Sequence, residues 1–427
     1  MRIALINPNW AFRGSIYFGC RSPHLPLEFA ISRHLLENAG HSVHLIDAHL
    51  FDLSISDITA ELTSFRPAMI ALTTAPTYLF WRCAPPELRV AQQLAQAVRD
   101  LSPLLVAVGP HGSTTPRAVL RKLGVDIVVM GECEATLLRL ANGERGFAGT
   151  CIRDGREIHV VGGPQAAQFV DQPPLTWPDE FIRRHRHHHH RFDADPLGPG
   201  AEVEGSRGCP YSCTFCAKEN FRNRYRRRGT DAVLQEVIGL QRQGVEYIYF
   251  IDEIFLPNEP LLRGLAGSGL KFGIQTRIDL WKPEMLAILG EAGCVSVECG
   301  IESLTPEGRD GLAKRCRMTT KQLADRLITA KRYIPFVQAN LIEVEQDDDA
   351  TVQRWRAQMQ DAGVWANDPV PLFPYPGSPD YRKLWGEPDD AAWERALDHY
   401  LARFDAFSDI QEQRPLHLHE LEMEAQG

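Results

Sequence analysis

Short apolar runs alternate with amphipathic stretches in two separate parts of this 427-residue chain, and this alternation limits the fold more than any other feature. In the first part, apolar residues recur every three or four positions between the runs, as in surface helices. Strands that are joined through helices pair in parallel. We therefore predict an α/β unit whose parallel sheet is covered by helices on both faces. Its expected strands are 2–6, 42–47, 68–73, 104–109 and 126–130.

The alternation resumes after residue 200 and continues for six units without an obvious reversal. Such a series favours a partial (β/α)6 barrel over a second open sheet, with active-site residues at the carboxyl ends of the strands. The expected strands of this second unit are 201–206, 247–252, 272–277, 295–300, 337–342 and 370–373.

The remaining segments are of a different kind. Residues 143–200 are rich in proline and contain a histidine run at 185–190, which predicts a linker or an extended wrap. Residues 387–427 are polar and have a helical pattern. The expected organisation is therefore a first domain over 1–142, a linker over 143–200, a barrel over 201–386 and a short helical extension over 387–427.

Composition excludes several classes of protein. Hydrophobic residues make up 44% of the chain and charged residues 24%, which is ordinary for globular proteins. The formal net charge of -9 argues against a general nucleic-acid-binding protein. No apolar run approaches the roughly 18 residues that span a bilayer, and the first apolar stretch is too short for a signal peptide. We expect a cytoplasmic protein that binds neither nucleic acid nor membrane.

Three of the ten cysteines lie within eight residues, directly after the first expected barrel strand. Cys209, Cys213 and Cys216 have the spacing C-x3-C-x2-C, which lets a short loop surround one soft metal centre. A four-iron cluster held by three cysteines keeps one iron open to another ligand. The alternative is a structural zinc site with a fourth ligand from Cys294, Cys299, Cys316 or a histidine.

This triplet, with Phe215 just before its last cysteine, resembles the motif of the radical S-adenosylmethionine (SAM) superfamily. The resemblance implies a [4Fe-4S] cluster on the three cysteines, with SAM bound to the open iron. It also implies that residues near the ends of the second, third and fourth barrel strands contact SAM. These residues are Asp252, Glu253, Gln275, Arg277, Glu298, Glu302 and Ser303, to which Phe215 is added. For Arg277 and Glu302, a structural ion pair across the rim is the alternative.

The fifth strand lacks the glycine and proline that this family usually has there, so no adenine contact is assigned. The loop LFPYPGSPDY at 372–381 resembles the closing loop of the cobalamin-dependent subgroup, and the first unit resembles its flavodoxin-like cobalamin-binding domain. The resemblance implies a cobalamin site at the carboxyl ends of the first sheet. Its expected residues are Asn7, Trp10, Thr73, Thr74, Gly109, Pro110, His111, Gly131 and Glu132.

Gly109 and Gly131 are expected to let the backbone approach a flat ring closely. Without the resemblance, the same segments are explained by turns and helix caps. His49 is rejected as a ligand of cobalt, because its motif follows the second strand and lacks the usual glycine. We expect cobalamin that has no histidine ligand.

Residues 221–228 contain five arginines. They suggest recognition of an anionic substrate or a redox partner, and a solvated loop is the alternative. The histidine run at 185–190 is not expected to be catalytic.

The resemblance implies an enzyme that cleaves SAM reductively to a 5′-deoxyadenosyl radical and methylates an unactivated carbon. The substrate would be a small molecule or a glycan, and the electron donor a reducing partner such as flavodoxin or ferredoxin. Two alternatives stay open: a cobalamin-dependent rearrangement or cyclisation without methyl transfer, and a non-catalytic sensor. The sequence identifies no catalytic residue.

Overall fold

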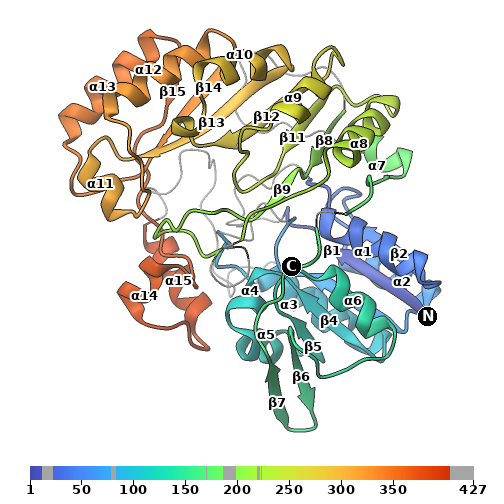
Figure 1. The fold of residues 1–427 in the computed structure, drawn as a ribbon. Helices are drawn as coiled ribbons and strands as arrows, with labels where there is room; N and C mark the ends of the chain where they lie inside the picture. The colour runs from blue at the N-terminus through green and yellow to red at the C-terminus, as the bar shows by residue number, and fades with distance from the viewer. Residues whose placement is uncertain are drawn as a thin grey trace.

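The computed structural model of the chain describes residues 1–11, 23–77, 83–169, 171–185, 199–218, 222 and 224–403. Figure 1 shows two α/β units, with the last helices α14 and α15 beside them. In the described part of the chain, no helix is both long and apolar enough to cross a membrane.

The N-terminal unit is built on a sheet whose first five strands are parallel and have the order β2-β1-β3-β4-β5. This is the flavodoxin-like order of doubly wound sheets, so the predicted fold class is confirmed for this unit. The strands consist of short apolar runs, which lie between helices on both faces and are therefore mostly buried. They are β1 (Arg2–Asn7), β2 (Ser42–Asp47), β3 (Met69–Thr73), β4 (Leu105–Val108) and β5 (Ile127–Val129).

The helices of this unit form two layers. Apolar residues of α1 and α6 belong to the core on one face, and those of α2, α3 and α5 to the core on the other. The helices are α1 (Leu27–Asn38), α2 (Ile55–Phe65), α3 (Arg89–Val98), α4 (Pro110–Thr114), α5 (Pro116–Leu123) and α6 (Glu134–Ala141).

The expected linker is partly wrong, because its first part belongs to the N-terminal sheet. The strands β6 (Thr150–Asp154) and β7 (Glu157–Val161) form an antiparallel hairpin that pairs with β5. This hairpin projects from the end of the sheet in Figure 1. The helix α7 (Asp179–Arg184) follows, and residues 186–190 of the histidine run lie outside the described residues.

The second unit is a six-stranded sheet whose strands pair in chain order, β8-β11-β12-β13-β14-β15, and all in parallel. The predicted partial barrel is therefore confirmed. Its strands are β8 (Gly200–Val203), β11 (Tyr247–Phe250), β12 (Lys271–Thr276), β13 (Cys294–Glu302), β14 (Phe336–Leu341) and β15 (Trp365–Ala366).

The sixth strand lies earlier than expected. Residues 370–373 contribute only an isolated bridge, between Val370 and Ile342. Pro369 and Pro371 flank Val370, and a proline has no N–H to donate to a neighbouring strand. The pairing with β14 therefore forms at β15 instead.

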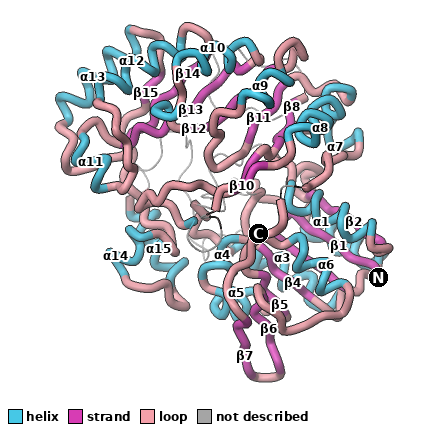
Figure 2. The backbone as a smooth tube through the Cα atoms, viewed as in Figure 1, coloured by secondary structure: helices cyan, strands magenta, loops and turns pink. Residues whose placement is uncertain are grey.

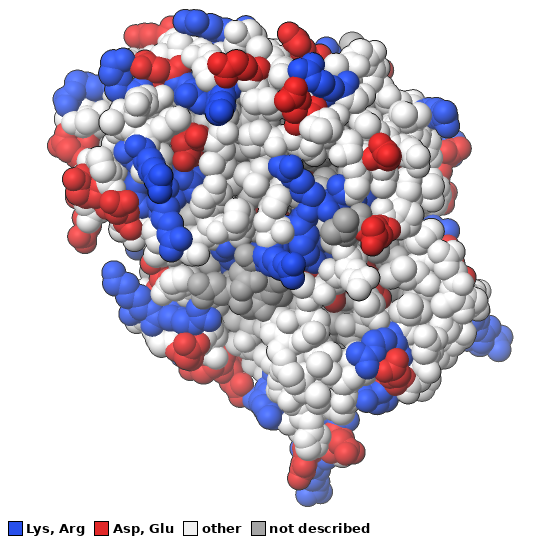
Figure 3. Space-filling view, viewed as in Figure 1, with Lys and Arg blue, Asp and Glu red and all other residues white. Residues whose placement is uncertain are grey.

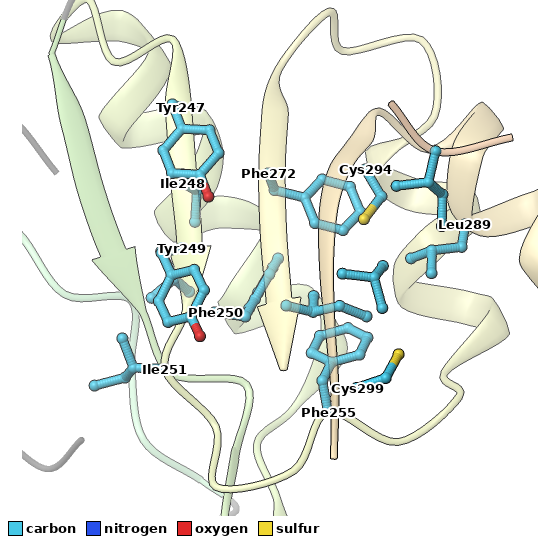
Figure 4. Packing of buried hydrophobic residues seen from close by; sticks show 14 of the residues in the cluster. Tyr247, Ile248, Tyr249, Phe250, Ile251, Phe255, Phe272, Leu289, Cys294 and Cys299 are labelled. Carbon is cyan, nitrogen blue, oxygen red and sulfur yellow. The ribbon is translucent and has the colours of Figure 1, made fainter. Parts of the chain in front are cut away.

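Helices cover the outer side of the barrel strands, as Figure 2 shows. They are α8 (Thr230–Arg242), α9 (Glu259–Leu265), α10 (Pro283–Glu291), α11 (Pro306–Gly311), α12 (Thr320–Lys331) and α13 (Asp349–Asp361). Figure 4 shows Phe272, Cys294 and Cys299 within the apolar core of this unit. Burial raises the pKa of both thiols well above the usual value.

The C-terminal extension packs against both units. The helix α14 (Pro379–Trp385) precedes the extension, whose described helix is α15 (Ala392–Ala402), and residues 404–427 lie outside the described residues. Trp393 of α15 belongs to the core of the N-terminal unit and donates from its indole Nε1 to Thr115 Oγ1 at 2.8 Å. Further along α15, Ala396 and Tyr400 pack with Phe373 of the closing loop.

Candidate functional site

The three cysteines lie on the loop that follows β8 and the short strand β9 (Ser206–Arg207). We call residues 208–218 the cluster loop. The three cysteines of this loop, Cys209, Cys213 and Cys216, are half-buried. Besides burial, the charge of the Cys209 thiolate contributes to raising the pKa of the Cys213 thiol. Three soft sulfur donors on one short loop fit an iron–sulfur cluster.

Neighbouring segments hold the cluster loop in place through its backbone. The N–H of Cys209 donates to Arg222 O at 3.2 Å. Thr214 donates its N–H to Leu312 O at 3.1 Å, and its carbonyl accepts the N–H of Asp380 at 3.0 Å. The loop is thus anchored to the barrel rim and to α14.

Two of the candidates for the fourth ligand of the alternative zinc site, Cys294 and Cys299, are buried in the barrel core. Cys316 is half-buried and stays a candidate. Over the described ranges, no group of three His, Cys, Asp or Glu residues could hold a metal ion as it stands.

Two acidic residues expected to contact SAM hold the start of the cluster loop. Asp252 accepts the N–H of Gly205 at 2.8 Å and the hydroxyl of Ser206, and burial raises the pKa of its carboxyl to about 7. Glu253 accepts the N–H of Gly208 at 2.7 Å and pairs with Arg222. Their expected contact with SAM stays a prediction, and support of the loop is a role that the sequence did not reveal.

Arg277, at the end of β12, has a structural environment. Its guanidinium donates to Asp279 at 3.1 and 2.8 Å and to Lys314 O at 2.6 Å. It also lies over the ring of Tyr211, 4.1 Å from the centroid. Because Tyr211 stands between Cys209 and Cys213, Arg277 steadies the cluster loop, and this favours the structural alternative.

Glu302 likewise forms a buried ion pair. Its carboxylate accepts from Lys314 Nζ at 2.6 Å and fills the space that a side chain at Gly300 would occupy. Burial raises the pKa of the Cys213 thiol, and the nearby ammonium of Lys314 opposes that rise. Sequence reasoning missed Lys314, because a single lysine between strands carries no motif.

Ser303 is also held within the protein. Its hydroxyl is buried and donates to Asp347 Oδ1 at 2.9 Å. The same carboxylate accepts the N–H of Leu304 and of Thr305. Ser303 thus closes the turn after β13, and its expected place near the ribose of SAM stays a prediction. Phe215 is half-buried on the cluster loop.

Gln275 and Glu298 form a polar row across the barrel together with Gln338. They are register partners on β12, β13 and β14. Phe272 and Ile274, which alternate with Gln275, belong to the apolar core, so the row projects from the opposite face of the sheet. Gln338, which sequence reasoning missed, donates to Asn340 Oδ1 at 2.6 Å. This row is therefore a further part of the expected SAM site whose contact with the ligand stays a prediction.

On the cobalamin side, two expected glycines serve the protein's own packing. A side chain at Gly109 would collide with Thr74 Oγ1, and one at Gly131 would collide with the backbone of Gln165. Both have positive φ, of 134° and 87°. Both glycines are therefore required by the protein's own packing, and their approach to a flat ring stays a prediction.

His111, which follows Pro110 at the start of α4, is buried with both ring nitrogens engaged. Nδ1 lies 3.0 Å from Thr74 Oγ1, and Nε2 lies 2.9 Å from Pro85 O. Burial lowers the pKa of this histidine to about 4, so the ring is neutral at pH 7. His111 thus has a structural role, and its contact with cobalamin stays a prediction. Thr73 is also turned inward, with its hydroxyl on Ala75 O at 2.7 Å.

Asn7 and Trp10 lie at the end of β1 in one hydrogen-bonded chain. Trp10 Nε1 donates to Asn7 Oδ1, and Asn7 Nδ2 donates to Asp47 Oδ1, both at 2.9 Å. Burial raises the pKa of Asp47 to about 6. The loop that continues from Trp10, residues 12–22, lies outside the described residues.

Glu132, expected at cobalamin, instead binds arginines of the second unit. Its carboxylate accepts from Arg226 at 2.9 and 2.5 Å and from the N–H of Ala167 at 2.6 Å. Burial alone would raise its pKa, but the charges of Arg207, Arg226 and Arg222 lower it to about 2. Glu132 is therefore an interdomain ion-pair residue.

The structure gives carboxylate partners to three arginines of the run. Arg222 and Arg226 pair with Glu253 and Glu132, and Arg228 pairs with Glu236 at 2.5 Å. These three are engaged inside the protein, whereas Arg224 and Arg227 are exposed, so recognition of an anion by the run stays a prediction. Figure 3 shows Lys and Arg side chains near the middle of the face on which the two units meet.

Glu28, in the first turn of α1, gives a testable pH effect. It is buried, and neither carboxylate oxygen has a hydrogen-bond partner among the described residues. Burial raises its pKa from 4.5 to about 8. Between these two pH values the carboxyl is ionised in the unfolded chain and protonated in the folded protein, so the free energy of unfolding falls as the pH rises. For Glu28→Gln we expect the stability advantage over wild type to grow by up to about 1.4 kcal/mol per pH unit across this range. Urea unfolding at pH 5 and pH 8 measures it, and an equal advantage at both values would contradict it.

Two family models match the chain. The model described as the radical SAM superfamily matches residues 203–354, and the B12 binding domain model matches residues 20–141. Together they confirm the expected order of a B12-binding domain and a radical SAM domain. They also confirm the expected cofactors: a [4Fe-4S] cluster, SAM and cobalamin.

Curated relatives are similar over most of the chain. An uncharacterized methyltransferase, PH0819, of Pyrococcus horikoshii is 25% identical over 348 residues, which are 78% of this chain and 72% of the relative. The anaerobic magnesium-protoporphyrin IX monomethyl ester cyclase of Cereibacter sphaeroides is 27% identical over 354 residues, 77% of this chain and 55% of the relative.

Among solved structures, the radical SAM methyltransferase TsrM of Kitasatospora setae, with cobalamin and a [4Fe-4S] cluster bound, has a TM-score of 0.70. It is 17% identical, and the match covers 90% of this chain and 77% of TsrM. At this identity the likeness establishes the shared fold.

Proposed function

We propose that this chain, a radical SAM protein with an N-terminal B12-binding domain, is a methyltransferase that cleaves SAM reductively to a 5′-deoxyadenosyl radical and methylates an unactivated carbon. The observation that carries the proposal is the position of the cluster loop. Both ends of this loop are paired with Glu132, which follows the last parallel strand of the B12-binding domain. A cluster on this loop, which would supply single electrons, and cobalamin in that domain, which would supply the methyl group, would therefore lie near each other.

The chain's own residues would divide the work. Cys209, Cys213 and Cys216 would hold the cluster, and the polar row of Gln275 and Glu298 would orient SAM along the barrel. When bound, the reduced cluster would supply an electron to the sulfonium and cobalamin would supply the methyl group. The barrel and the domain above it would exclude water, which would otherwise divert the radical.

We propose a small-molecule substrate. Arg222, Arg226 and Arg228 are paired within the protein, so the exposed Arg224 and Arg227 are the residues of the arginine run that would meet an anionic substrate. The electron would come from a reducing partner such as flavodoxin or ferredoxin, and we accordingly place the protein in the cytoplasm.

A second candidate is cyclisation without methyl transfer. It is favoured by relatives named as magnesium-protoporphyrin IX monomethyl ester cyclases, of which one, from Rubrivivax gelatinosus, matches 90% of this chain. Both candidates require SAM cleavage, and they differ in whether cobalamin carries a methyl group.

The test is anaerobic reconstitution with iron, sulfide and hydroxocobalamin, followed by desalting and an absorption spectrum. We expect retained cobalamin bands beside the broad absorption of the cluster. After addition of SAM and a reductant, 5′-deoxyadenosine should form, and S-adenosylhomocysteine should accompany it because SAM is the source of the methyl group. 5′-Deoxyadenosine without S-adenosylhomocysteine would favour the cyclase, and the absence of both would favour the sensor.

A further inference from the structure

Two buried arginines mark the ends of the cluster loop. Arg207 is the last residue before the loop, and Arg222 follows it closely. The side chain of Arg207 is 0% exposed and that of Arg222 is 2% exposed. Arg207 pairs with Glu204 at 2.9 Å, and Arg222 pairs with Glu253. Each end of the loop therefore carries a positive charge that lies out of contact with water.

Both arginines also reach carboxylates of the B12-binding domain. Arg207 lies 2.7 Å from Glu134 and 3.4 Å from Glu132, and Arg222 lies 3.5 Å from Glu132. Arg226 adds the bidentate contact with Glu132. We call these residues the interdomain ion network: Glu132, Glu134, Glu204, Glu253, Arg207, Arg222 and Arg226.

Buried charges make this network sensitive to the position of the domain. An ion that loses its partner in the protein interior carries a large desolvation penalty. If the B12-binding domain moved away from the barrel, Arg226 would lose its carboxylate, and Arg207 and Arg222 would each lose a neighbouring negative charge. The position of the domain and the conformation of the cluster loop are therefore energetically linked.

We infer that Glu132 is a positioning residue that fixes the cluster loop relative to the B12-binding domain. Glu132 is the member of the network that lies within 3.5 Å of all three arginines. In the holoenzyme it would set the placement of the cluster with respect to cobalamin, a consequence that rests on the proposed function. Its effect on the loop itself does not depend on any cofactor.

The test compares Glu132→Gln with Glu236→Gln. The control removes an equally buried carboxylate, which pairs with Arg228 at 2.5 Å within the second unit. Hydrogen exchange of the cofactor-free chain is measured first. In Glu132→Gln, amides of the cluster loop should exchange at least about tenfold faster, because three arginines lose a shared partner. In Glu236→Gln the increase should be confined to α8 and the segment near Leu175, which also bonds Glu236.

The reconstituted holoenzyme gives a second readout. In Glu132→Gln, the amount of 5′-deoxyadenosine formed per S-adenosylhomocysteine released on methylation of the reduced cobalamin by SAM should rise by at least about tenfold, because radical formation continues while cobalamin, the methyl acceptor in this assay, is misplaced. The EPR signal of the reduced cluster should also change, and the control should keep the wild-type ratio and signal.

Glu132→Gln with wild-type exchange in the cluster loop would overturn the inference, and so would a product ratio equal to that of the control. If Glu132→Gln does not fold, Arg226→Gln takes its place, because the Arg226 side chain is 11% exposed and at the margin of the network. Wild-type protein that binds no cluster would refute the proposed function, while the exchange experiment would still decide the role of Glu132.

Discussion

Replacement of Cys213 by alanine should abolish cluster retention and SAM cleavage. A three-cysteine site has no spare protein ligand, so two thiolates cannot keep the cube in a protein that is desalted and exposed to competing chelators. We expect the iron content of the reconstituted protein to fall from about four per chain to near zero. Iron and sulfide analysis measures this directly, and 5′-deoxyadenosine formation should fall below detection.

Cys316→Ala is the matched control for this experiment. Cys316 is half-buried, lies in the same unit and was considered as a fourth zinc ligand. This variant should keep the full iron complement and the wild-type rate of SAM cleavage. Full iron in Cys213→Ala would refute the assignment of the triplet, and loss of metal from Cys316→Ala would revive the zinc site.

Replacement of Trp393 by alanine should lower the free energy of unfolding more than the other tryptophan replacements described below. Trp393 is 2% exposed, its ring centroid lies 4.3 Å from that of His111, and its indole N–H bonds Thr115. Removing a buried tryptophan typically costs about 3–5 kcal/mol, since a cavity remains. The loss should fall on the N-terminal unit and on the docking of α15, and faster hydrogen exchange in α4 and α5 would localise it there.

Two further tryptophan variants separate the loss of apolar packing from the loss of the hydrogen bond to Thr115 and compare α15 with α14. Trp393→Phe keeps most of the apolar volume and loses the hydrogen bond, so a smaller cost of about 1–2 kcal/mol is expected. Trp385→Ala removes a half-buried tryptophan of α14 and should cost less than Trp393→Ala. Equal unfolding midpoints in urea for wild type and Trp393→Ala would show that α15 does not stabilise the N-terminal unit.

Local patterns allowed the sequence to determine the two units and to predict the cluster ligands. A run such as 68–73 becomes a strand because apolar residues in a parallel sheet are covered on both faces, and in the structure all residues of β3, Met69–Thr73, are buried. Cys209, Cys213 and Cys216 lie close along the chain, so a single loop can present them together. The family resemblance then supplied the cofactors, which the two family models confirm.

The partners of the polar side chains were decided only by the tertiary structure. Glu132 lies 94 residues before Arg226, and neither residue has a sequence signal that points to the other. Gly131 is a glycine because the backbone of Gln165 passes over it, a contact that no local pattern indicates. Periodicity records which face of an element is buried, whereas ion pairs and close backbone contacts depend on which distant segments meet. For this reason the sequence indicated where charged residues gather, and the fold determined that the arginines at the cluster loop face inward to the neighbouring domain.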